Sequence, residues 1–111
     1  LYPLPLIGSS PPEPVEPAVT DGRLSQNYPN PFNPSTTIDY YLPEAAPVEI
    51  TILNVLGQTI ITLVSETVPA GLHSVTWNGV DDAGQRVASG VYFYRLTTPD
   101  KLETKKMVVL K

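Results

Sequence analysis

The chain has 111 residues, a net charge of −4 and no cysteine. This length suits one ordinary domain, the lack of cysteine excludes disulfides and thiolate metal sites, and the acidic balance argues against nucleic acid as a partner. No apolar run is long enough to span a membrane. Because the chain starts at Leu1 and no charged segment precedes an apolar stretch, we expect a fragment or processed product of a longer protein.

The first part of the chain is rich in proline, above all in the run Ser9-Ser-Pro-Pro-Glu-Pro-Val-Glu-Pro17. Proline fixes φ and lacks an N–H, so this run favours an extended polyproline II conformation. We therefore predict a semi-rigid linker over residues 9–23, with a disordered chain end as the alternative. Residues 1–8 are interpreted as the tail of an upstream module or as an expression artefact, and residues 24–111 as the folded domain.

A motif with three prolines, Asn27-Tyr-Pro-Asn-Pro-Phe-Asn-Pro34, follows the linker. Residues that precede proline are driven towards extended conformations. The motif is thus predicted to lie extended across the folded core, with Tyr28 and Phe32 packed against it and one edge or end of the core closed. A role in recognition by a partner is the alternative interpretation.

The rest of the chain alternates apolar and polar residues in short runs separated by glycine, proline, asparagine and aspartate. Period-2 alternation is typical of half-buried strands, and no segment has a helical period. The predicted strands cover residues 37–42, 48–53, 58–64, 72–77, 85–87, 91–98 and 102–110. About seven short strands with this spacing predict an all-β antiparallel β-sandwich.

The inward positions of these strands form the predicted core. Its members are Ile38, Tyr40, Leu42, Val48, Ile50, Ile52, Ile61, Leu63, Val75, Trp77, Tyr92, Tyr94 and Leu96.

Three small groups of residues are candidate sites. Asn78, Asp81 and Asp82 share one loop and could supply oxygen ligands to Ca²⁺, although the same residues are ordinary turn formers. His73 is the only histidine, and without a nucleophile motif it is expected to be a strand residue rather than a catalytic base. No cofactor is expected.

Tyr41 and Phe93 fall on the face opposite the predicted core positions. Exposed aromatics could form a sugar-stacking platform, as in a carbohydrate-binding accessory module of a secreted enzyme. Cross-strand packing of the two rings on a sheet is the structural alternative.

Several motifs together resemble a known family. They begin with Leu24-Ser-Gln-Asn-Tyr-Pro-Asn-Pro-Phe-Asn-Pro-Ser-Thr-Thr-Ile38 and continue through Val48–Gln58, Ala70–Gly79 and Ser89–Leu96 to Lys105-Lys-Met-Val-Val-Leu-Lys111. In this order they resemble the type A C-terminal sorting domain of the type IX secretion system. The chain is also similar to the immunoglobulin-like domain of the flagellar hook-capping protein, which makes the predicted sandwich immunoglobulin-like.

The resemblance implies a non-catalytic sorting or surface-attachment module of a larger secreted protein, often a glycoside hydrolase or peptidase. The implied partners are the outer-membrane translocon, a sortase-like peptidase and a cargo domain in the same chain, with a destination outside the cell or on its surface, reached through the periplasm and outer membrane. Cleavage in the family falls upstream of the proline motif, which here means between Ser9 and Leu24.

The last strand is the main candidate for recognition. The predicted recognition residues are Gly90, Tyr92, Lys105, Lys106, Met107, Val108, Val109, Leu110 and Lys111. Strand addition to a partner is one interpretation, and lysines that protect an edge strand from aggregation are the other. On the first interpretation, deleting residues 105–111 would abolish export and leave much of the sandwich folded.

Overall fold

Six β-strands follow one another along residues 23–110, the part of the chain that the computed structural model describes. The predicted upstream tail and almost all of the predicted linker lie outside these residues. The strands are β1 (Thr36–Leu42), β2 (Ala46–Leu53), β3 (Thr59–Val68), β4 (Gly71–Trp77), β5 (Gly90–Thr98) and β6 (Lys101–Val109).

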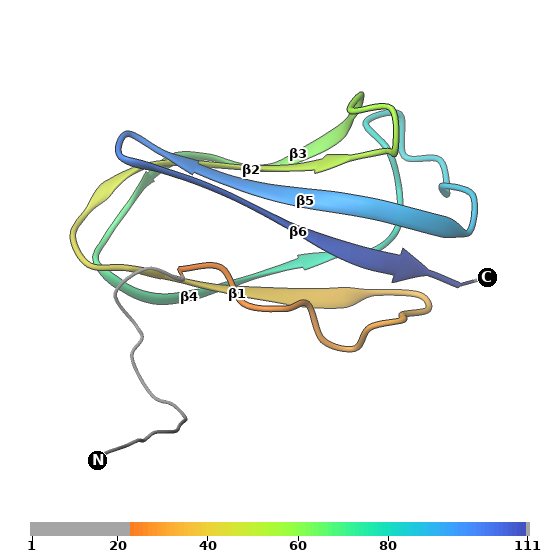
Figure 1. The fold of residues 1–111 in the computed structure, drawn as a ribbon, viewed down its shortest axis with the longest axis horizontal. Coiled ribbons are helices and arrows are strands. Elements are labelled where there is room, and N and C mark those ends of the chain that lie inside the picture. The colour runs from red at the N-terminus through yellow and green to blue at the C-terminus, as the bar shows by residue number, and fades with distance from the viewer. Residues whose placement is uncertain (1–22, 111) are drawn as a thin grey trace, which may run out of the picture.

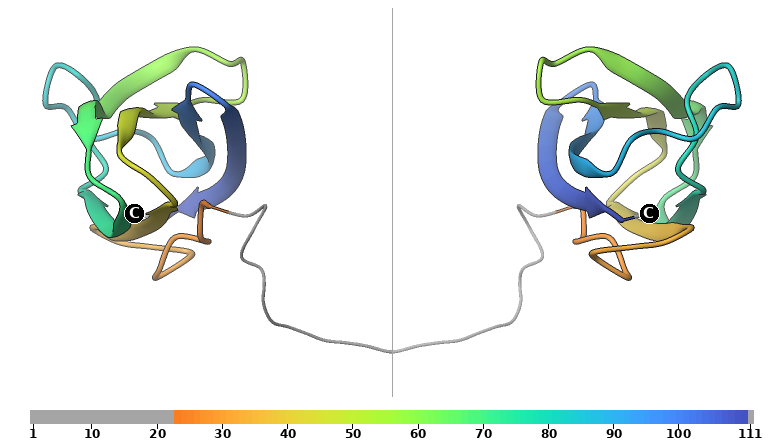
Figure 2. Two further views of the ribbon diagram at one scale, coloured as in Figure 1. Left: turned by 90° about the vertical axis from the view of Figure 1, so that its left-hand side faces the viewer. Right: turned by 90° about the vertical axis from the view of Figure 1, so that its right-hand side faces the viewer.

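The strands form two sheets that pack face to face (Figures 1 and 2). One sheet has the order β1-β4 and the other the order β3-β2-β5-β6, and every strand pair is antiparallel. The described residues therefore confirm the predicted all-β antiparallel sandwich. Within residues 23–110 there is no helix that is long and apolar enough to cross a membrane.

The predicted seventh strand, residues 85–87, is reduced to an isolated bridge between Val80 and Arg86. Local turn bonding explains the difference, because the Asp81 carboxylate accepts hydrogen bonds from the backbone N–H groups of Ala83 and Gln85, each at 2.9 Å. Aspartate side chains that bond to nearby backbone groups compete with strand pairing in this way. The turn prediction for this loop was thus right, and the short strand was wrong.

The core lies between the two sheets and follows the period-2 alternation of the strands. Ten of the predicted core residues are buried: Ile38, Tyr40, Leu42, Val48, Ile50, Ile52, Trp77, Tyr92, Tyr94 and Leu96. Three others, Ile61, Leu63 and Val75, are only partly buried against this cluster. They lie on β3 and β4, each of which is the last strand of its sheet and has a neighbour on one side only.

Six further apolar residues are buried, of which only Phe32 was predicted to pack against the core. These are Leu24, Phe32, Leu53, Val68, Met107 and Val109. Met107 and Val109 show that β6 takes part in the core, so the last strand is more than an outer layer.

The predicted turn between β2 and β3 is confirmed. The Asn54 side chain accepts hydrogen bonds from the backbone N–H groups of Leu56 and Gln58, at 2.9 and 3.0 Å. Gly57 takes a φ of +81° in this turn, a conformation that costs little without a Cβ atom.

Candidate recognition surface

Residues 23–32, called the strap below, extend the two-stranded sheet. The strap runs antiparallel to β1, on the edge that β4 leaves open. Four backbone hydrogen bonds of 2.8–3.0 Å join the two segments, among them a reciprocal pair between Tyr28 and Thr37. The first half of the strap therefore acts as a short third strand beside β1.

The second half of the strap crosses to the other sheet and pairs with β6. The Phe32 N–H donates to the carbonyl of Val108 at 3.1 Å, and the N–H of Leu110 donates to the Phe32 carbonyl at 2.9 Å. This forms a parallel bridge between Phe32 and Val109. The strap thereby closes the side of the sandwich between β1 and β6. Figure 1 shows the strap in orange alongside β1.

Two strap side chains also bond to the backbone of β6. The Gln26 amide donates to the carbonyl of Lys106 at 2.8 Å, and the Asn30 side-chain oxygen accepts the N–H of Val108 at 2.9 Å. An edge strand presents unpaired backbone groups to solvent. These amides therefore substitute for a neighbouring strand from Lys106 onwards.

The proline motif is not uniformly extended. It bends at residues 29–31 and 33–34, and the peptide bonds that precede Pro29, Pro31 and Pro34 are cis. The predicted closure of one edge is confirmed, whereas the predicted continuous extended course is wrong beyond Tyr28. The chain has to bend there because its two halves pair with strands of different sheets.

Tyr94 anchors the strap from inside the core. Its hydroxyl donates to the carbonyl of Ser25 at 2.6 Å and accepts the N–H of Asn27 at 2.8 Å. Burial raises the pKa of the Tyr94 phenol to about 12, although the hydrogen bond from the Asn27 N–H works in the opposite direction. A fully buried side chain on β5 thus fixes the path of a segment almost 70 residues away in the sequence.

A buried polar cluster supports the same segment. The Asn27 amide donates to the Thr36 hydroxyl at 2.9 Å and to the Pro29 carbonyl at 3.1 Å, and the Thr36 hydroxyl donates to the Pro29 carbonyl at 2.8 Å. Asn27 is 3% exposed and Thr36 is 1% exposed. Buried polar groups of this kind are expected to be hydrogen-bonded. The sequence alone did not reveal that Asn27 and Thr36 form a buried hydrogen-bonded cluster, because asparagine and threonine near prolines are also common in open turns.

The two aromatic residues of the motif differ in burial. Phe32 is 2% exposed, and its ring meets the Trp77 ring edge-on at a centroid distance of 5.5 Å, while Trp77 contacts Tyr92 at 5.9 Å. Tyr28 is 79% exposed, since it pairs with Thr37 on the outward-facing side of β1. The prediction of a packed ring is confirmed for Phe32 and wrong for Tyr28.

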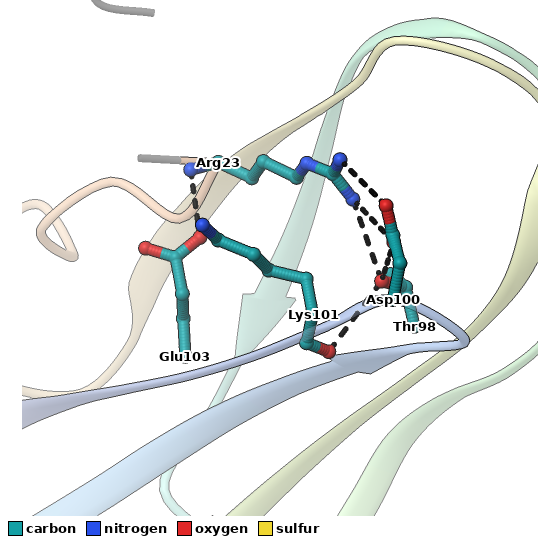
Figure 3. A network of polar contacts seen from close by, with 5 residues as sticks. All are labelled: Arg23, Thr98, Asp100, Lys101 and Glu103. Atoms are coloured by element: carbon teal, nitrogen blue, oxygen red, sulfur yellow. Dashed lines mark hydrogen bonds and ion pairs between the residues drawn. The ribbon is translucent and has the colours of Figure 1, made fainter. Parts of the chain in front are cut away.

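Arg23 joins the start of the strap to the β5–β6 hairpin by hydrogen bonds (Figure 3). Its guanidinium donates to both carboxylate oxygens of Asp100, at 3.0 and 3.2 Å, and its backbone N–H donates to the Glu103 carboxylate at 2.7 Å. The hydrogen bond from Arg23, followed by one from Thr98, lowers the pKa of the Asp100 carboxyl group. The point at which the predicted linker meets the domain is therefore firmly positioned.

The predicted recognition residues divide by exposure. Tyr92, Met107 and Val109 are buried in the core. The accessible ones are Gly90, Lys105, Lys106, Val108 and Leu110. Lys111 lies outside the described residues. In the folded domain a partner can therefore contact one face of β6 and its neighbours, whereas the buried members hold that face in place.

The candidate calcium loop shows the bonding of an ordinary turn. The Asp81 carboxylate is engaged by two backbone N–H groups of its own loop. No group of three or more His, Cys, Asp or Glu side chains within residues 23–110 is arranged to hold a metal ion.

His73 lies on β4 as a strand residue. Its Nε2 atom is 2.7 Å from the Pro69 carbonyl oxygen, and its ring packs on Tyr40 at a centroid distance of 5.5 Å. No serine or carboxylate of the described chain bonds to this ring. The geometry thus offers no nucleophile–base pair at the histidine.

Tyr41 and Phe93 do not form a common platform. Tyr41 lies on β1 and Phe93 on β5, in different sheets whose outer faces point in opposite directions. A hollow of about 460 Å³ on the four-stranded sheet, at its Pro47 and Thr97 end, has no aromatic residue in its lining. The structure therefore contradicts the alternative in which these two rings form one sugar-stacking platform.

Charge is distributed very unevenly along the chain. Five of its seven basic residues, but only two of its eleven acidic residues, lie within residues 95–111. This stretch has a charge of +3, whereas the remainder has a charge of −7. The β5–β6 hairpin is thus a basic feature on an otherwise acidic chain, and such asymmetry can orient an encounter with a charged partner.

Comparison with known proteins identifies the family to which this fold belongs. The model of the FlgD Ig-like domain family matches residues 33–101. No curated protein matches the chain significantly. Among solved structures, the chain is similar to PorZ of Porphyromonas gingivalis, described as an essential bacterial surface component of the type IX secretion system. The identity is 27%, the TM-score is 0.57, and the match covers 78% of this chain and 11% of PorZ.

Two further structures share the fold. Dimeric latent PorU of Porphyromonas gingivalis matches with a TM-score of 0.65 and 19% identity, over 86% of this chain and 10% of PorU. FlgD of Xanthomonas campestris, described as a hook-capping protein essential for flagellar assembly, matches with a TM-score of 0.55 and 24% identity, over 79% of this chain and 67% of FlgD. The chain thus spans about a tenth of the length of the two Porphyromonas proteins.

Proposed function

Since this chain belongs to the FlgD Ig-like domain family and is similar to part of a type IX secretion component, we propose that it is a non-catalytic sorting module. It directs a larger secreted protein through the type IX secretion system to the cell surface. The partners are the outer-membrane translocon and a sortase-like peptidase, and the cargo is an upstream domain of the same chain.

The similarity to PorZ carries this proposal. It extends over 78% of the chain at 27% identity, and PorZ belongs to the secretion system that the sequence motifs also indicate. The similarity to FlgD of Xanthomonas campestris, at 24% identity, supports the fold and no specific role in the flagellum.

The geometry is suited to presenting a surface rather than to catalysis. The strap and β6 are joined by backbone and side-chain hydrogen bonds and form one continuous unit. The backbone N–H and C=O of Arg23 are both bonded, to Glu103 and Tyr41. Cleavage by a peptidase is therefore proposed on the N-terminal side of Arg23.

The experiment that tests the proposal is a secretion assay with the whole chain. Residues 1–111 are fused to the C-terminus of a periplasm-targeted fluorescent protein and expressed in a host that has the type IX system. We expect the fluorescent protein to become accessible to protease added outside intact cells. A strain that lacks the translocon should retain it in the periplasm.

A matched pair of variants locates the signal. Lys105→Ala combined with Lys106→Ala removes two charges from β6 and should reduce surface display, because both side chains are accessible there. Arg86→Ala removes an exposed cation from the β4–β5 loop and should leave display unchanged. A wild-type fusion that stays in the periplasm of the competent host would overturn the sorting proposal.

A further inference from the structure

We infer that the open part of the β6 edge, Leu102–Lys106, is the docking site for an extended acidic strand of a partner protein. The inference rests on the proposed function and names the mode of recognition at the same surface. It assigns recognition to the middle of β6, upstream of the residues that the strap covers.

The direction of the backbone groups follows from the register. The N–H and C=O of Val108 both bond to the strap and therefore point away from β5. In an antiparallel ladder this orientation recurs at every second residue, and the pairing of β5 with β6 runs from residue 101 to residue 109 without a shift. The backbone groups of Leu102, Thr104 and Lys106 thus point outward as well.

The strap covers only part of this row. It bonds to the Lys106 carbonyl and to the backbone beyond it. Within residues 23–110, no backbone or side-chain group bonds to the outward groups of Leu102 or Thr104. At this point the strap pairs with β1 instead, so a ladder of about four hydrogen bonds remains available to another chain.

The side chains around the open edge favour an acidic partner. Lys106 is exposed and Lys105 is half-exposed. Arg95 is paired with Thr104 across the ladder, and its Nε is buried without a partner among the described residues. Opposite charges on neighbouring strands stabilise pairing, and like charges oppose it. Leu102, which is 62% exposed, adds an apolar contact for a side chain of the added strand.

A binding experiment with defined peptides tests this inference. The probes are a synthetic hexapeptide of alternating valine and glutamate and a control in which lysine replaces each glutamate. They are titrated into the isotopically labelled full chain and followed by nuclear magnetic resonance. We expect the acidic peptide to shift the amide signals of Leu102, Thr104 and Lys106 and to slow their hydrogen exchange, and the basic peptide to do neither.

A backbone substitution separates strand addition from simple charge attraction. Thr104→Pro removes one outward N–H, and proline is tolerated on an edge strand when its N–H position faces solvent. Thr104→Val keeps the N–H and serves as the control. The proline variant should lose the response to the acidic peptide and the valine variant should keep it. If the proline variant does not fold, Lys105→Glu combined with Lys106→Glu, which should also abolish the response, replaces it.

Several outcomes would overturn the inference. The first three are an absence of amide shifts at millimolar peptide, equal shifts with both peptides, and shifts confined to strands other than β6. The fourth is a shift of the β6 amide signals with protein concentration alone, which would reveal pairing of β6 with a second copy of the chain.

The secretion assay separates the docking edge from the proposed function. A wild-type fusion that is not displayed contradicts the proposed function. A displayed wild type with an equally displayed Thr104→Pro variant contradicts only the docking edge.

Discussion

Tyr94 shows how one side chain can determine the course of a whole segment. Its hydroxyl is the only group of β5 that bonds to the backbone of the strap among the hydrogen bonds of the described chain, and it uses both its donor and an acceptor position there. The ring itself is fully buried. A core residue thus also acts as the internal anchor of a surface feature.

Replacing Tyr94 by phenylalanine should destabilise the domain with little change in packing. The substitution leaves the Asn27 N–H and the Ser25 carbonyl without their partner, and an unpaired buried polar group costs about 1–3 kcal/mol. Urea unfolding followed by tryptophan fluorescence measures the loss. A free energy of unfolding equal to that of the wild type would show that the strap is not held by this hydroxyl.

The same residue predicts the alkaline behaviour of the domain. The Tyr94 pKa rises from 10.0 to about 12 on folding, so its contribution to stability is complete below pH 10 and is lost as the pH rises towards 12. We expect the free energy of unfolding to fall over this interval. Tyr94→Phe should show a shallower fall, and equal slopes for the two proteins would contradict the assignment.

At the scale of elements, the strap is part of the sandwich rather than an appendage. It contributes Leu24 and Phe32 to the core and pairs with one strand of each sheet. Edge strands are usually protected by charges, bulges or a covering segment. Here the strap covers the outer edge of β1 and the last residues of β6, which leaves the middle of β6 open.

The two aromatic residues of the strap provide a matched pair of substitutions. Phe32→Ala should lower the free energy of unfolding by about 3–5 kcal/mol, because it removes a buried ring from the contact with Trp77. Tyr28→Ala should change it by less than about 0.5 kcal/mol, since this ring is exposed. Thermal unfolding by circular dichroism compares them, and equal losses would contradict the different burial of the two rings.

Removal of residues 105–111 should unfold much of the domain. The sequence suggested that export could be separated from folding by this deletion, but the deletion takes Met107 and Val109 from the core and Val108 from its bonds with the strap. We expect the truncated chain to lose its β-sheet circular dichroism signal. A truncated chain with the wild-type spectrum would show that β6 is dispensable for the fold.

At the scale of the whole molecule, the strap and both sheets are expected to unfold together. The strap amides of Ser25, Tyr28 and Phe32 are bonded to strands of different sheets. Their hydrogen exchange should therefore be as slow as that of bonded amides in β5. Exchange of the strap amides at the rate of an unstructured chain, with β5 still protected, would show that the strap opens independently.

Much of the fold could be predicted because it is encoded locally. Alternation along β1, β2 and β5 identified nine of the buried core residues. The predicted strand at residues 85–87 failed for an equally local reason, the Asp81 turn, which periodicity does not detect. The same reasoning about large rings in the proline motif was right for Phe32 and wrong for Tyr28, which is 79% exposed.

The recognition surface was less predictable because it depends on contacts between distant residues. The sequence marked the proline motif and the last strand separately, and both belong to the surface. It could not show that Gln26 and Asn30 bond to β6, or that Met107 and Val109 would be buried. Exposed and buried positions on an edge strand look alike until the neighbouring segment is known.

By itself, the sequence determined the strand class, the turns, most of the core and the uneven charge, since each depends on neighbouring residues or on composition. Only the tertiary structure decided which edge of the sandwich is closed and which part of β6 stays open. That decision depends on the anchor at Tyr94 and the bonds from the strap to β6, which join residues about 70–80 positions apart. No local pattern can specify such pairings, because they exist only once the two sheets have packed.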